Sequence, residues 1–146
     1  MDGAAIVLLL KRGKMVEQAE WTKMKILRVE TFEDYEFIRQ LRTDPRTESG
    51  FLTKAVISSS DQIEYMSKHK DDYYVCYYNQ LRVGYCGVVD NDIRFCVVPY
   101  YHGMGIGKFM LRHMKNLYPE ATGRIKRENF GSIMAFQKEG IKFTIV

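Results

Sequence analysis

The sequence has few of the residues that mark metal sites and disulfide scaffolds. It contains three cysteines in 146 residues, and none of them forms a C-x-x-C pair. Zinc sites usually use thiolates and imidazoles at short spacing, so we expect no metal. Cys76, Cys86 and Cys96 each lie in a strand-like run. This setting favours buried, reduced thiols in a cytoplasmic protein, and a nucleophilic cysteine is the alternative.

Long hydrophobic runs are also missing. The longest purely apolar run, AAIVLLL at 4–10, has seven residues, whereas a membrane helix needs about 20. No basic segment precedes this run and no small-residue cleavage site follows it, so we expect neither a signal peptide nor a membrane partner. MKILRVE at 24–30 is typical of a chain entering its first strand. We therefore expect one domain over 24–146, with 1–23 as an extension.

The charge is modest overall but unevenly placed. The net charge is +4, and residues 101–146 carry eight Lys/Arg against three Asp/Glu. A basic C-terminal part suits an anionic ligand. The chain has no helix-turn-helix, zinc-finger or RNP-like signature, so we expect no nucleic-acid partner.

The apolar pattern predicts a mixed α/β fold in the order β-α-α-β-β-β-α-β-α-β. A spacing of three to four residues predicts helices, and alternation predicts strands. The expected helices are 32–42, 60–69, 106–117 and 129–139, and the expected strands are 26–30, 73–80, 81–89, 93–98, 122–126 and 141–146. Short turns join the three central strands, which predicts an antiparallel meander.

A glycine-rich loop follows the third strand of this meander. Glycines 103, 105 and 107 precede a helix, so backbone N–H groups at its first turn can hold a pyrophosphate. Walker A is excluded because His102 and Phe109 stand where that motif needs Gly and Ser or Thr. The dinucleotide fingerprint is excluded because the spacing is G-x-G-x-G and the preceding strands are antiparallel. A tight glycine turn with no ligand is the alternative.

Two motifs together resemble the GNAT N-acetyltransferases, which bind acetyl-coenzyme A (acetyl-CoA). Residues 97–107 read V-x-P-x-x-x-G-x-G-I-G, and 129–140 read N-x-x-S followed by K-x-G. His102 stands where the family usually has Arg or Gln, and Ile141 follows K-x-G where the family has Phe. The resemblance implies an acyl-CoA N-acyltransferase fold: a mostly antiparallel sheet, splayed after strand four and flanked by about four helices. The implied cofactor-binding residues are Cys96, Val97, Val98, His102, Gly103, Met104, Gly105, Ile106, Gly107, Lys108, Asn129 and Ser132.

The resemblance also implies direct attack of a primary amine on the thioester. Asp92 is the candidate base, with a turn aspartate as the equal alternative. A strand-four N–H, such as that of Val97, would donate a hydrogen bond to the oxyanion. Phe136 stands where the family often has Tyr, so Tyr101, Ser132 or water is the candidate acid.

Further expectations concern the phosphates of CoA and the acceptor amine. Lys108, Arg112 and Arg124 are candidates for the adenosine phosphates, against the alternative of solvated surface charges. LRTDP at 41–45 and ISSSDQIEYM at 57–66 are similar to the branch with flagellin-sugar and ribosomal-protein N-terminal acetyltransferases. The acceptor could be an amino-sugar nucleotide, a protein N-terminus or a small amine.

Two alternatives stay open at this point. Many GNAT proteins end with two strands, whereas this chain ends after IKFTIV, which favours a homodimer or pairing with AAIVLLL. A GNAT-like module that binds acyl-CoA without turnover is the alternative to an enzyme.

Overall fold

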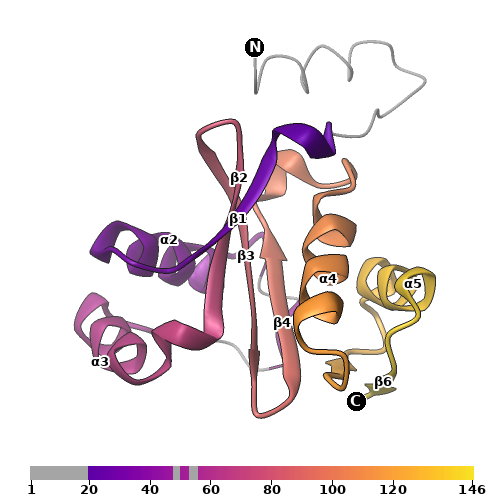
Figure 1. Cartoon of the computed structure of the whole chain (residues 1–146). Helices are drawn as coiled ribbons and strands as arrows, with labels where there is room; N and C mark the ends of the chain where they lie inside the picture. Colours follow the sequence, from indigo (N-terminus) through magenta and orange to yellow (C-terminus); the bar gives the residue numbers. More distant parts are fainter. Residues whose placement is uncertain (1–19, 48–49, 53–55) are drawn as a thin grey trace.

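The helices and strands follow one another in the predicted order (Figure 1). The computed structural model describes residues 20–47, 50–52 and 56–146. The strands are β1 (Met24–Arg28), β2 (Tyr73–Tyr78), β3 (Leu81–Val89), β4 (Asp92–Val97), β5 (Gly123–Ile125) and β6 (Phe143–Ile145). The helices are α2 (Phe32–Thr43), α3 (Ser59–His69), α4 (Ile106–Leu117) and α5 (Phe130–Glu139), with short 3₁₀ turns at 21–23, 70–72 and 99–101. The AAIVLLL run lies outside the described residues, and within them no helix has the length and apolar character needed to cross a membrane.

The strands form two sheets that meet at one end of β4. One sheet has the order β1-β2-β3-β4 with antiparallel neighbours, and β5 and β6 form a parallel pair. A single backbone bridge joins Asp92 of β4 to Thr122, where the N–H of Ile93 donates to the Thr122 carbonyl at 2.8 Å. Beyond this bridge the strands diverge, which confirms the predicted splay after strand four.

Helices cover both faces of the four-stranded sheet. Figure 1 places α2 and α3 on one face and α4 and α5 on the other. Side chains alternate along β4, so that Ile93 packs in the cluster with α4 and α5, whereas Cys96 packs in the cluster with α2 and α3. β4 therefore separates two apolar layers and presents a different set of side chains to each.

Local sequence signals set the helix ends that flank the site. Thr31 and Asp34 form a reciprocal capping box at the start of α2. The Asn129 side chain accepts from the N–H of Ser132 and begins α5, and Gly140 ends α5 with φ 70°. The extension predicted for 1–23 contributes to the packing at its end, because Trp21 lies 5.3 Å from the Phe109 ring of α4.

Five of the six strands differ by one or two residues from the predicted bounds, and β3 matches. The first strand begins at Met24 and pairs with Tyr78, two residues earlier than expected. The last strand spans Phe143–Ile145 and begins two residues late, because the Ile141 N–H donates to the Phe136 carbonyl at 3.0 Å at the end of α5.

Candidate active site

The outer edge of β4 is open where β4 and β5 diverge. The Val98 N–H donates to the Val83 carbonyl at 2.8 Å, so Val98 faces β3. Neighbouring residues of a strand point their backbone groups in opposite directions. The N–H and C=O groups of Phe95 and Val97 therefore face the gap, as those of Ile93 do at the bridge.

His102 closes part of this edge. Its Nε2 lies 2.8 Å from the Val97 carbonyl oxygen and donates to it. The imidazole at the position of the motif's usual Arg or Gln thus ties the loop after β4 back to the strand. The Val97 N–H remains directed at the gap.

The glycine loop adopts a backbone that glycine alone adopts easily. Gly103 and Gly105 have φ values of 80° and 83°. A side chain in this left-handed region costs about 1–2 kcal/mol. Gly105 is also the N-cap of α4. No side chain at this position accepts from the first N–H groups of the helix, so these groups stay directed at the loop. A helix N-terminus with this backbone is suited to an anion.

One cavity of about 990 Å³ joins the loop, the β4 edge and the space beside α2 and α3. Twelve predicted site residues line it: Asp92, Cys96, Val97, Tyr101, His102, Gly103, Gly105, Ile106, Gly107, Lys108, Asn129 and Ser132. Val98 and Met104 do not line it. Met104 is 1% exposed and packs in the core, whereas Val98 packs with α2 and α3.

The predicted basic residues separate into two groups. Lys108 and Arg124 line the cavity. Arg112 instead pairs with Glu139 of α5 at 2.9 Å and stacks over Trp21 at 4.8 Å. Arg112 therefore joins two helices and lies outside the cavity lining.

Asp92 lies at the base of the gap and is held by two arginines. Its Oδ2 is 3.3 Å from Nη2 of Arg124 and 3.7 Å from Nε of Arg94. The side chain is 19% exposed, so it is accessible from the cavity that it lines. The structure thus gives this residue both charged partners and contact with the candidate site.

The candidate acids surround the same gap. Burial raises the pKa of Tyr101 above its usual value, which keeps its hydroxyl protonated at neutral pH. Phe136 is 2% exposed and lies between Phe95 and Phe143, with ring centroids 6.1 and 6.0 Å away. This nearly buried apolar ring packs against Gly123 of β5 and contributes to the lining of the cavity.

The three cysteines are buried and unpaired, as predicted. Burial raises the pKa of the Cys76 and Cys96 thiols to about 12. Because the thiolate is the nucleophile, neither thiol is suited to nucleophilic catalysis.

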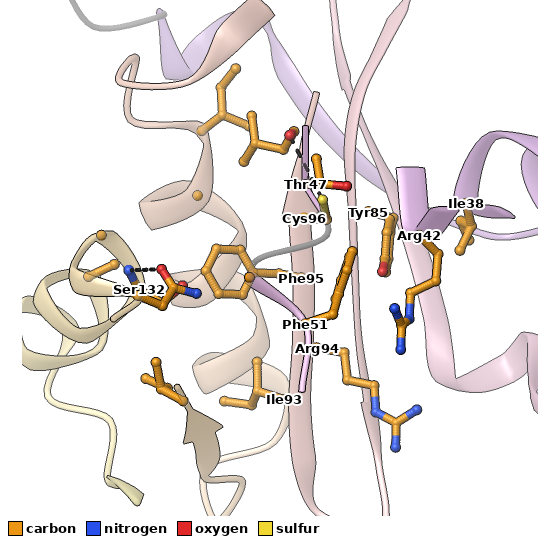
Figure 2. A pocket seen from close by; sticks show the side chains of 18 of the residues that line it. Ile38, Arg42, Thr47, Phe51, Tyr85, Ile93, Arg94, Phe95, Cys96 and Ser132 are labelled. Carbon is orange, nitrogen blue, oxygen red and sulfur yellow. Dashed lines mark hydrogen bonds between the residues drawn. The ribbon is translucent and has the colours of Figure 1, made fainter. Parts of the chain in front are cut away.

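The α2 and α3 side of the cavity contains residues that the sequence did not point to. Arg94 of β4 donates to the hydroxyls of Tyr65 and Tyr73 at 3.4 and 3.3 Å. Arg42 stacks over Phe51 with its guanidinium carbon 4.1 Å from the ring centroid. Figure 2 shows Arg94, Arg42 and Tyr85 on one side of β4 and Phe95 on the other. Arg94 shares its strand face with Asp92, which is the signal that could have identified it.

Structure comparison assigns the fold. The chain superposes on a spermidine N-acetyltransferase from Vibrio cholerae in complex with CoA and spermine, with a TM-score of 0.71, 14% identity and coverage of 82% of this chain and 80% of that chain. It is also similar to a GNAT-family acetyltransferase from Streptococcus pneumoniae, with a TM-score of 0.63, 14% identity and 80% and 83% coverage. A ribosomal-protein-alanine N-acetyltransferase from Brucella melitensis gives a TM-score of 0.68, 15% identity and 80% and 83% coverage.

No family model matches the sequence, and no curated protein matches it. At these identities the likeness defines the fold: the chain has the GNAT acetyltransferase fold. The fold class predicted from the sequence is confirmed.

Proposed function

We propose that the protein is an N-acetyltransferase that uses acetyl-CoA to acetylate a primary amine. One observation carries the proposal: the open edge of β4 leads directly into the glycine loop at the α4 N-terminus, and one cavity contains both. A CoA molecule has the matching parts in the same order. Its pyrophosphate suits the loop, and the amides of its pantetheine arm suit the strand edge.

The reaction follows from this placement. The neutral amine nitrogen forms a bond to the thioester carbonyl carbon, and the developing oxyanion accepts from the Phe95 or Val97 N–H. The C–S bond then breaks to leave an amide and a thiolate. Asp92 accepts the proton of the amine through water, because it lies about 10 Å along the strand from Phe95 at about 3.3 Å per residue. Tyr101, Ser132 or water returns a proton to the thiolate.

Two glycine variants test the cofactor site. Gly105→Ala places a side chain in the loop, whereas Gly140→Ala introduces the same left-handed strain (φ 70°) at the far end of α5. Both should lower the melting temperature by a similar amount. CoA should raise the melting temperature of the wild type and of Gly140→Ala, and Gly105→Ala should lose most of that rise. Equal CoA responses in both variants would contradict the assignment of the loop.

A second candidate function is a domain that binds acyl-CoA without turnover. Phe136 favours it, because this ring cannot donate a proton to the leaving thiolate. Thiol release from acetyl-CoA across a panel of amines separates the two candidates. Stabilisation by CoA with no thiol release would support the binding domain.

A further inference from the structure

The cavity extends onto the α2 and α3 face of β4. We call this part the acceptor chamber. It is lined by Arg42, Phe51, Tyr65, Tyr73, Tyr85 and Arg94. Figure 2 shows Arg42, Tyr85 and Arg94 across β4 from Phe95, and the same cavity is lined by residues on both sides of the strand. A second substrate entering here would meet the thioester from the face opposite α4 and α5.

Arg42 offers this chamber a positive charge without a complete set of partners. Phe51 covers one face of its guanidinium at 4.1 Å. The Nη1 atom is buried and has no hydrogen-bond partner among the described residues. Burying a charged donor without an acceptor is costly. A ligand oxygen in the chamber would supply the missing acceptor.

Arg94 offers a second positive charge, with the Asp92 carboxylate 3.7 Å from its Nε and neutral hydroxyls at its Nη1. The hydroxyls of Tyr65 and Tyr73 accept from its Nη1 and hydrogen-bond to each other at 2.9 Å. Burial and the contact with Tyr65 raise the pKa of Tyr73 well above its usual value, so this hydroxyl does not ionise at neutral pH. The tyrosines therefore position Arg94 without cancelling its charge.

The charges lining the whole cavity are mostly positive. Among the described lining residues, the acids are Asp61 and Asp92, and the Lys and Arg residues are Arg42, Arg46, Arg94, Lys108, Arg124 and Lys138. Asp92 is already paired with two of these arginines. A polyamine, which carries several positive charges, would face Arg42 and Arg94 in the acceptor chamber.

We propose that the acceptor is a small amine that also carries an oxyanion, a carboxylate or a phosphate, and that Arg42 and Arg94 bind this oxyanion. The inference rests on the proposed acetyl transfer. Guanidinium groups recognise carboxylate and phosphate oxygens in bidentate geometry. Arg94 is adjacent in sequence to Phe95, whose N–H faces the gap. The Nε atom of Arg94 also lies 3.7 Å from Asp92, the proposed proton acceptor, so an amine whose oxyanion binds Arg94 lies near that acceptor, as an amino acid or an aminoalkyl phosphate would.

Matched amine pairs test this inference. L-phenylalanine is compared with L-phenylalaninamide, and phosphoethanolamine with ethanolamine, with spermidine as the cationic probe. We expect the kcat/KM from thiol release to be at least tenfold higher for the anionic member of at least one pair. The pair that shows the preference identifies the oxyanion as carboxylate or phosphate.

Arginine variants locate the effect. Arg42→Gln and Arg94→Gln should each lower kcat/KM for the preferred anionic amine at least tenfold more than they lower it for the neutral partner of that amine. Arg28→Gln is the control, because Arg28 also stacks over an aromatic ring, Tyr74 at 5.3 Å, but lies outside the cavity lining. Stabilisation by CoA checks that each variant is folded. If Arg42→Gln does not fold, Arg42→Lys is used in its place.

The outcomes separate this inference from the proposed function. Thiol release with neutral or cationic amines at equal or higher efficiency would retain acetyl transfer and overturn the anionic acceptor. Melting-temperature shifts of the CoA complex with the anionic amines, lost in Arg42→Gln but without thiol release, would retain the acceptor chamber and contradict acetyl transfer. If none of these amines gives thiol release or a melting-temperature shift, both the anionic acceptor and the proposed acetyl transfer are overturned.

Discussion

The Asp92 carboxylate lies 3.3 Å from the Arg124 guanidinium, beside the backbone bridge that joins β4 to the start of β5. The ion pair therefore closes the narrow end of the gap between the two strands. Asp92 is placed both to hold the strands together and to accept a proton from an amine in the cavity. Substitutions of Asp92 and Arg124 distinguish these two roles by their effects on kcat.

We predict that Asp92→Asn lowers kcat about 100-fold, because removal of a general base typically costs 10²-fold or more. Arg124→Gln should lower kcat less than tenfold, because the carboxylate remains. Steady-state thiol release measures both. Asp90→Asn is the control, since Asp90 is an exposed turn residue with φ 51°, a conformation that asparagine tolerates.

A purely structural ion pair would behave differently. Asp92→Asn and Arg124→Gln would then cause equal losses, and the double variant would lose no more than either single variant. This result would remove Asp92 from the list of proton acceptors.

We predict that Phe136→Tyr raises kcat about tenfold, because Phe136 lines the cavity and a hydroxyl on its ring supplies the proton donor for the leaving thiolate that the phenyl ring lacks. The KM for acetyl-CoA should stay within twofold. Phe143→Tyr is the matched control, since its ring contacts Phe136 at 6.0 Å but does not line the cavity. An unchanged kcat in Phe136→Tyr would mean that the thiolate leaves without an acid at this position.

We predict that Asp34→Asn lowers the free energy of unfolding by roughly 1–2 kcal/mol at pH 7, as loss of an N-cap contact does. Burial disfavours the ionised Asp34, but hydrogen bonds from the Glu30 and Thr31 amides and the nearby Arg82 lower its pKa below the usual 3.8. A lowered pKa in the folded state means that the stabilisation is present above pH ~4 and is lost as the pH falls through the folded-state value.

Chemical denaturation at several pH values measures this dependence. The difference between the wild type and Asp34→Asn should shrink below pH ~4. Glu33→Gln, an exposed acid in the same helical turn, should show a much smaller difference at pH 7. A difference that is the same at every pH would contradict the ionised cap.

The sequence predicted those parts of the fold that depend on neighbouring residues. The apolar stripe of 106–117 predicted α4 with its observed bounds, and Gly140 predicted the end of α5. The first strand was placed two residues late, because its pairing with Tyr78 comes from a distant part of the chain.

The candidate site was likewise predicted only where it depends on neighbouring residues. The glycine loop follows from local backbone requirements, so spacing alone predicted it. The acceptor chamber was not predicted, because Arg42, Phe51 and Arg94 come from a helix, a loop and a strand that meet only in the folded chain. The role of His102 was missed for a similar reason, since its contact with the Val97 carbonyl depends on the turn between them.

Backbone amide spectra of the CoA complex test the central claim most directly. With ¹⁵N-labelled protein, CoA should cause the largest amide shifts at Phe95 and Val97, whose N–H groups face the gap, and in the loop at Gly103 and Gly105. The Arg94 and Cys96 amides, which point toward β3, should change less. Binding of CoA that leaves the Phe95 and Val97 amides unchanged would contradict an acyl-CoA site on the open edge of β4.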